Sequence, residues 1–310
     1  MSPRKSEAER IAAIVALVCR DVGRGTAALI EASSGGLEAA ARSLAAATSV
    51  GLITGFFVPR GEVNAPETDG PVGTALLAAG LAACGVPARI AVDTPCAHAV
   101  RVAVAEAEAV TGRASVIVDE VGVADHEGLE RLGETWRRAS LSHVVSIERC
   151  GRSADGQPRN MRGVSVGAWT APLDDLFLAG PWTRLAVGDG GNEIGMGRLP
   201  AGLIAEKVPH GATIACVTGC DHLVVAGVSN WGAYGLMAAL AVVRPYWAPS
   251  LARFLDAARD LAVTRAVVER GGAVDGVTAR REATVDGFGP EVHGPLVDEL
   301  GRIARGQASD

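Results

Sequence analysis

The chain has 310 residues, of which 48% are hydrophobic, and its formal net charge is −6. This composition is sufficient for a large core, and the acidic balance without a block of Lys or Arg argues against a nucleic-acid or membrane-surface partner. The longest apolar runs, Ile11–Cys19 and Leu236–Val243, are shorter than the ~20 residues of a membrane-spanning helix. We recognise no secretory signal at the start and therefore expect a cytoplasmic location.

Helical and strand patterns alternate along most of the chain. Helices are predicted over 6–22, 36–47, 71–84, 95–110, 127–139, 173–179, 230–243, 248–270 and from 290 onward. Strands are predicted over 50–54, 89–92, 115–118, 143–147, 185–187, 213–217 and 222–228. This order predicts an α/β fold with three layers, a mostly parallel, Rossmann-like β-sheet with helices on both faces. No linker or repeat divides the chain, so we expect a single domain over residues 1–310.

A glycine-rich segment, Val187–Gly197, follows the predicted strand 185–187. Its five glycines allow a close approach to a ligand, and Asp189, Asn192 and Glu193 add polar groups. Since open α/β sheets bind ligands at the carboxyl ends of their strands, we expect a binding loop here. A tight turn with solvated acids is the alternative, which we consider weaker.

A long loop, 55–71, leads into the predicted helix 71–84. Loops of this length in compact domains are commonly functional. Asp69 or Thr68 is predicted to cap the helix, with Pro71 in its first turn. Capping explains neither Glu67 nor the length of the loop, so this loop is a second candidate for the site.

Two more strand ends carry polar residues. Glu148 and Arg149 close the strand 143–147, and Arg149 could bind a carboxylate or join a surface ion pair. Asn230 is predicted to cap the helix that ends at Val243, whose amino end is a candidate anion site. His222 begins a strand, where a structural role is the stronger alternative.

Two further motifs are weaker. The string Gly23–Ala28 resembles a dinucleotide fingerprint but follows a helix, so a helix end whose Arg24 reaches elsewhere is favoured. Cys216 and Cys220 with His222 could hold a metal, but no second Cys pair completes a zinc set and buried thiols are favoured.

Taken together, the motifs resemble the D-glutamate cyclase family, specifically the C-terminal cyclase domain of its longer members, which carry an additional N-terminal domain. The motifs are 54–57, 66–71, 147–149 with 160–163, 188–197, 221–222 with 227–232, and 275–278 with 281–282. Cys150 and Ser165 depart from the pattern that we expect of the family. The resemblance implies cyclisation of D-glutamate to 5-oxo-D-proline with loss of water.

This reaction needs proton transfer and a polarised carboxylate. Catalytic candidates are Asp189, Glu193, Asn192 and His222. Substrate-binding candidates are Glu67, Thr68, Asp69, Gly70, Arg149, Asn160, Arg162, Gly190, Gly191, Asp221, Ser229 and Asn230. Asp189, Glu193, Glu67 and Asp69 could instead hold Mg²⁺ or Mn²⁺.

Two other classes of protein remain alternatives. One is a non-catalytic module that binds an acidic amino acid. The other is a nucleotide-dependent α/β enzyme, against which the absence of a phosphate-loop motif argues, so no nucleotide is expected. The expected partner is a small molecule, and the small-residue helices 71–84 and 232–243 could pack within one subunit or between subunits of a homo-oligomer.

Overall fold

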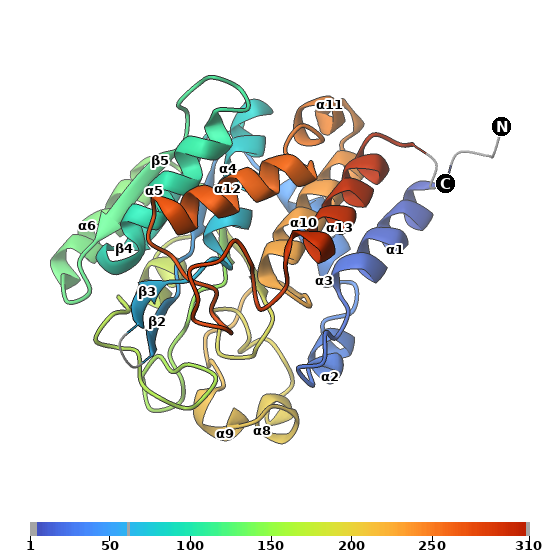
Figure 1. Cartoon of the computed structure of the whole chain (residues 1–310). Coiled ribbons are helices and arrows are strands. Elements are labelled where there is room, and N and C mark those ends of the chain that lie inside the picture. The colour runs from blue at the N-terminus through green and yellow to red at the C-terminus, as the bar shows by residue number, and fades with distance from the viewer. Residues whose placement is uncertain (1–4, 61–62, 308–310) are drawn as a thin grey trace.

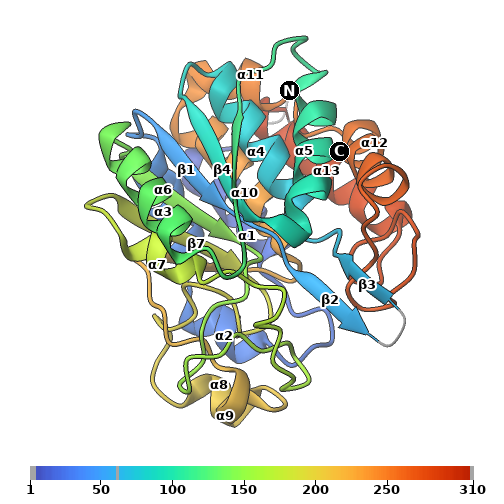
Figure 2. The same cartoon turned by 90° about the vertical axis from the view of Figure 1, so that its left-hand side faces the viewer.

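The structure, a computed structural model, describes residues 5–60 and 63–307. Its centre is a parallel six-stranded sheet in the order β5-β4-β1-β6-β7-β8 (Figure 1, Figure 2). The strands are β1 Val50–Ile53, β4 Ala88–Asp93, β5 Ile117–Val121, β6 His143–Ile147, β7 Thr183–Gly188 and β8 His222–Val225. The chain runs outward from β1 to one edge and then returns to build the other half from β6. This doubly wound order places a topological switch between β1 and β6 and confirms the predicted fold class.

Helices cover both faces of the sheet. They are α1 Glu7–Val18, α2 Ala27–Ala32, α3 Gly36–Leu44, α4 Pro71–Ala83, α5 Thr94–Glu108, α6 His126–Arg138, α7 Leu173–Leu178, α8 Leu203–Lys207, α9 Gly211–Ile214, α10 Ser229–Val243, α11 Ala248–Leu251, α12 Ala257–Glu269 and α13 Pro290–Ala304, with a 3₁₀ turn at Pro245–Trp247. Helices α4, α5 and α10 pack together on one face, where α1, α12 and α13 cover them, while α6 and α7 pack together on the other face.

The sheet strands alternate their side chains between two hydrophobic cores. Leu52 and Val145 belong to the core under α4, α5 and α10, whereas Ile53 and Val144 belong to the core under α6 and α7. Helices α4 and α10 are buried almost throughout, so their small residues serve close packing inside this subunit. An oligomeric state stays a prediction.

Three segments differ from the predicted elements. The loop 55–71 contains an antiparallel hairpin, β2 Phe57–Arg60 and β3 Val63–Pro66, whose residues 61 and 62 lie outside the described part. Residues 213–217 are not a strand but the end of α9 and an irregular segment. The predicted helix 248–270 is two helices. Helix α11 ends at Leu251, and Asp256 caps α12 by accepting a hydrogen bond from Arg259 N.

The amino ends of α4 and α10 cap each other, which corrects two predicted caps. Asp69 accepts hydrogen bonds from Ser229 N at 3.0 Å and Asn230 N at 2.8 Å, and so caps α10. Asn230 Oδ1 in turn accepts from Gly70 N and Gly73 N at 2.9 Å, and so caps α4. Asn230 thus lies in the first turn of α10 and does not cap its own helix. The expected anion site there is filled by Asp69.

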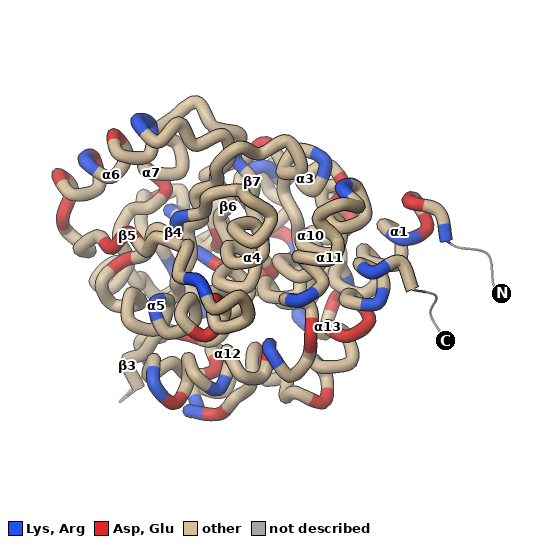
Figure 3. Tube along the Cα trace, turned by 90° about the horizontal axis from the view of Figure 1, so that it is seen from above, with Lys and Arg blue, Asp and Glu red and all other residues tan. Residues whose placement is uncertain are grey.

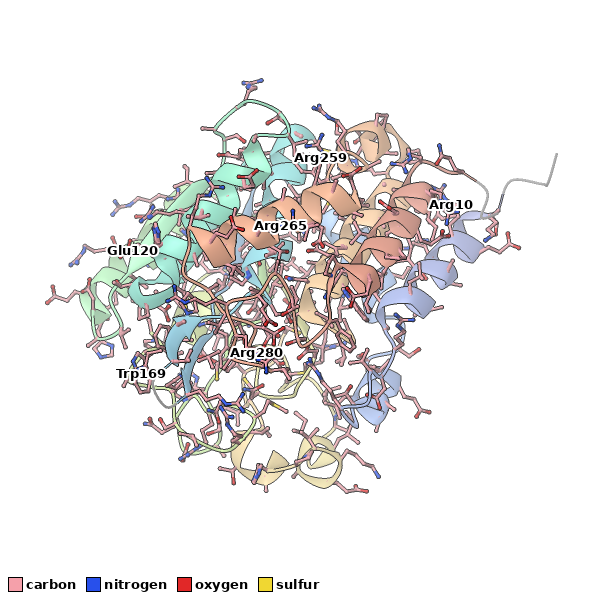
Figure 4. The ribbon with its side chains drawn as sticks, viewed as in Figure 1. Arg10, Glu120, Trp169, Arg259, Arg265 and Arg280 are labelled. Atoms are coloured by element: carbon pink, nitrogen blue, oxygen red, sulfur yellow. The ribbon has the colours of Figure 1, made fainter. Side chains whose placement is uncertain are left out.

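Two contacts join segments that are far apart in the described part of the chain. Arg10 of α1 donates to Ile303 O of α13 at 2.7 Å, and Trp169 stacks on Phe57 of the hairpin (Figure 4). Seen from above, Lys and Arg are interspersed with Asp and Glu over the helices (Figure 3). No helix of the described residues is long and apolar enough to cross a membrane.

Candidate functional site

A cavity of about 270 Å³ lies at the carboxyl ends of β6 and β7, beside the switch point. Its walls come from the hairpin β2–β3, the glycine-rich loop after β7 and the loop between α12 and α13, which lies beside the hairpin (Figure 2). The lining residues are Arg24, Phe56, Phe57, Val58, Pro59, Arg60, Glu67, Glu148, Asn160, Met161, Arg162, Asp189, Asn192, Glu193, Gly276, Val277 and Asp286. The lining combines apolar side chains with arginines and carboxylates.

Three buried carboxyl groups in this cavity are easier to protonate than usual. Burial raises the pKa of Glu67, Glu148 and Asp189 well above the ordinary values. Neighbouring acids raise them further: Asp286 acts on Glu67 and Asp189, and Asp189 acts on Glu148. A raised pKa lets a carboxyl group keep its proton at a higher pH than usual, which suits a group that takes part in acid–base catalysis.

One arginine lies inside the acid cluster. Arg24 follows α1, and its Nη1 is 3.0 Å from Asp189 Oδ2 while its Nη2 is 2.8 Å from Asp286 Oδ2. The Asp21 carboxylate fixes the turn by accepting from Gly23 N and Arg24 N. The Arg24 side chain therefore reaches away from its own helix end, as the sequence had favoured.

The glycine-rich loop is folded around Glu193. The carboxylate of Glu193 accepts from three backbone groups, Asp189 N at 3.1 Å, Gly190 N at 2.6 Å and Gly191 N at 2.7 Å. Gly191 has φ of +109°, which a residue with a side chain would rarely adopt. Glu193 thus shapes the loop that presents Asp189, with lone pairs left for a cation.

Two acidic residues of the cavity have strained backbones. Glu148 has φ of 42° and Asp286 has φ of 56°. Left-handed conformations are uncommon for residues other than glycine, and strain of this kind clusters at functional sites. Ser229 Oγ donates to Glu148 Oε2 at 2.5 Å and fixes the side chain in this position.

The carboxylates form two groups that could each hold a metal ion. Asp69, Asp189 and Asp286 make one group, and Glu148, Asp189 and Glu193 make the other, with one oxygen of each residue within 4.8 Å of those of its group. Asp189 belongs to both. Cys216, Cys220 and His222 belong to neither, and the two thiols are buried.

Of the sixteen catalytic and substrate-binding residues predicted from sequence, six line the cavity and seven lie next to it. Glu67, Asn160, Arg162, Asp189, Asn192 and Glu193 line the cavity. Thr68, Asp69, Gly70, Ser229 and Asn230 lie directly behind it, and Gly190 and Gly191 supply the backbone that holds Glu193. The predicted binding loop is thus part of the cavity wall.

Three predicted residues lie elsewhere. Arg149 is 1% exposed, pairs with Asp93 at 2.6 Å and donates to two backbone carbonyls; its Nε has no partner, but the side chain is buried and does not line the cavity. His222 begins β8 level with Leu185, about 13 Å before the loop along the strand direction. His222 lines a separate hollow, and Asp221 pairs with Arg184.

Sequence reasoning did not place Arg24 and Asp286 in the site. Both come from segments outside the sheet and reach the cavity only through tertiary packing. Glu148 was noted at a strand end, but only the structure shows that it contacts Ser229 and lines the same cavity as Asp189.

A family of known proteins is similar to this chain over the residues that form the cavity. The family model of D-glutamate cyclase-like C-terminal domains matches residues 14–301. A human protein named D-glutamate cyclase, mitochondrial, is 35% identical over 217 residues, which are 66% of this chain and 34% of the relative. The chain thus spans about a third of that relative's length. Because the family model matches nearly the whole chain and includes every residue that lines the cavity, the chain belongs to the D-glutamate cyclase-like family, whose C-terminal domain it matches.

Proposed function

We propose that this protein is a lyase that converts D-glutamate to 5-oxo-D-proline with loss of water. The observation that carries the proposal is the cluster of buried, readily protonated carboxyl groups, Glu67, Glu148 and Asp189, in one cavity of a D-glutamate cyclase-like chain. The relative's name supports the same activity. A cytoplasmic location is a separate prediction.

The reaction joins two ends of one molecule. The substrate ammonium loses a proton, and its nitrogen attacks the carbon of the side-chain carboxylate to form the new C–N bond. The nitrogen loses a second proton as the amide forms, the C–O bond breaks, and the leaving oxygen takes up two protons in all and departs as water. Asp189 is our candidate for the base that accepts the ammonium proton, and Glu148 or Glu67 for the acid that protonates the leaving oxygen.

The cavity also has to overcome charge repulsion, because the substrate brings two carboxylates to a wall of acids. Arg60 and Arg162 line the cavity and are candidates to bind one carboxylate. The remaining acid excess suits Mg²⁺ or Mn²⁺, which prefer oxygen ligands. Glu67 Oε1 is buried without a hydrogen-bond partner, which fits a cation close by. When bound, the ion would withdraw electrons from the carboxylate that is attacked.

The aromatic and aliphatic wall would act on the substrate by position. Phe56, Val58 and Met161 line the same cavity and would favour a conformation in which the five-carbon chain folds back on itself. Holding the reacting groups in contact lowers the activation free energy, by as much as about 7–11 kcal/mol in well-oriented systems.

The test is incubation of the purified protein with D-glutamate and, separately, L-glutamate, in Mn²⁺ or Mg²⁺ and then in EDTA, with chiral chromatography of 5-oxoproline. We expect product from D-glutamate, and loss of product in EDTA. Binding of D-glutamate without product under all these conditions would favour a binding module and overturn the proposed reaction.

A further inference from the structure

We propose that Arg24 is a built-in cation of this site: its guanidinium fills one half of the acid cluster, so that the cluster takes one divalent ion, between Glu148, Asp189 and Glu193. The inference rests on the metal-assisted form of the proposed function, in which Glu148 and Asp189 bind the ion as carboxylates instead of serving as acid and base. Arg24 would thus be a positioning residue that sets the number and the place of bound divalent ions before substrate binds.

The two carboxylate groups differ in how their charge is balanced. In the group of Asp69, Asp189 and Asp286, Arg24 contacts two of the three residues at 3.0 and 2.8 Å. Asp69, the third, already accepts from Ser229 N, Asn230 N and Gly70 N. This half already holds a positive charge where an ion would otherwise bind.

The other half has carboxylates without a cation. Within the described residues, no ion pair joins Lys or Arg to Glu148 or Glu193, which are 6% and 1% exposed. Glu148 has one hydroxyl donor, from Ser229, and Glu193 has only backbone donors. Hydrogen bonds of this kind orient ligating carboxylates without neutralising them.

An independent observation also points to a ligand here. Glu67 is 7% exposed, lines the same cavity, and its Oε1 has no hydrogen-bond partner. A buried carboxylate oxygen left without a partner is costly, and a cation in the cavity removes that cost. Glu67 belongs to neither group of three, but its unpartnered oxygen shows that the cavity both groups share lacks a donor or a cation.

Arginine is suited to this task because its planar guanidinium bridges two carboxylates and stays charged. The turn fixed by Asp21 delivers it from outside the sheet. If its charge is removed, Asp69, Asp189 and Asp286 become a second oxygen site. Asp189, which belongs to both groups, would then bridge two ions.

The experiment measures Mn²⁺ bound per chain by equilibrium dialysis, together with the EPR spectrum of the bound ion, without substrate. We expect the wild type to bind one Mn²⁺ with a hyperfine sextet. Arg24→Gln should bind two and give an exchange-coupled spectrum, and Arg24→Lys should restore one ion and the sextet. Arg42→Gln is the matched control, because Arg42 also bridges two acids, Glu7 and Glu38, but on the surface; it should behave as wild type.

Two further variants leave Arg24 in place and test the location of the ion. Glu148→Gln should weaken Mn²⁺ binding by more than about 10-fold, whereas Asp286→Asn should retain the one ion. Two ions or none in the wild type, one unchanged ion in Arg24→Gln, or loss of the ion in Asp286→Asn but not in Glu148→Gln would each overturn the proposal. A wild type that binds one Mn²⁺ but does not turn over D-glutamate would instead overturn only the proposed reaction.

Discussion

The acidic residues at the two ends of the parallel sheet differ in how fully basic residues balance their charge. At the amino end of β8, Asp221 lies 3.2 Å from Arg184; burial opposes its ionisation, but hydrogen bonds from Arg184 outweigh this and lower the pKa of Asp221. At the carboxyl end, burial and neighbouring acids raise the pKa of Glu148 and Asp189. Charges with their own partner contribute to stability, whereas an excess of buried acids costs stability. That cost is expected where a site serves function.

The largest expected effect is a loss of activity when an acid at the carboxyl end of the sheet, but not at the amino end, is replaced. Asp189→Asn should lower kcat/KM for D-glutamate by about 10²–10⁴-fold, while the melting temperature does not fall, since a buried charge is removed. Asp221→Asn is the matched control at the other end and should retain activity. Initial rates and thermal melts of both variants test this. Full turnover by Asp189→Asn would remove Asp189 from the mechanism.

The carboxyl end of the sheet also contains a paired charge, because Arg149 and Asp93 form a fully buried ion pair there. This pair can be compared with the excess acids of the cavity. Arg149→Met leaves the Asp93 charge unpaired and should lower the free energy of unfolding by about 3–5 kcal/mol. The double variant Arg149→Met/Asp93→Asn should regain part of this loss. Denaturant unfolding measures both, and an unchanged midpoint for Arg149→Met would show that the pair is not what stabilises this region.

The acid excess predicts an unusual dependence of stability on pH. Because Glu67, Glu148 and Asp189 have raised pKa values in the folded protein, the folded state binds more protons than the unfolded state above about pH 4. Their contribution is complete below that pH and is lost as the pH rises through the folded values. Urea unfolding in EDTA should show stability falling as the pH rises above the ordinary carboxyl range of about pH 4, and Mn²⁺ should reverse the fall. A steady rise in EDTA would contradict the raised pKa values.

A smaller effect is expected from the loop between α12 and α13. A Cβ on Gly276 would overlap Glu67 Oε2. Gly276→Ala should therefore displace the Glu67 carboxylate and reduce kcat/KM by about tenfold, or about 1.4 kcal/mol. Gly294→Ala in α13 is the control, because its Cβ would meet only Ala257 at 3.4 Å. Equal activity of the two variants would mean that Glu67 is not needed in its observed position.

The fold was predictable because buried parallel strands are continuous apolar runs, as in His143–Ile147, whose predicted and observed bounds agree. The segment 213–217 is also rich in β-branched residues, but in the folded protein it forms the end of the short helix α9 and an irregular stretch. Tertiary packing therefore overrides its strand propensity. Helices α2 and α8 were not predicted either. They are short, and their buried residues Leu29 and Ile204 become core residues only when the loops around the sheet are packed.

The site was predictable to the extent that it depends on the carboxyl ends of strands. Asp189 and Glu193 follow β7, so local pattern was sufficient for them, whereas Glu67 was a candidate because of the length of the loop 55–71, whose hairpin was not predicted. Arg24 and Asp286 contact each other across more than 260 residues of chain, and no local pattern encodes that contact. His222 was misplaced because a residue that begins a parallel strand lies at the opposite end from one that follows it.

The exchange of caps between Asp69 and Asn230 has a consequence for how the molecule opens. The amides of Gly70, Gly73, Ser229 and Asn230 each donate to Asp69 or Asn230 at the amino end of the other helix, and Gly70 N is shared with the neighbouring Asp69. Neither helix can fray at this end without releasing its partner, so these four amide protons should exchange with solvent at one common, slow rate. The wall behind the cavity therefore opens as one cooperative unit or not at all.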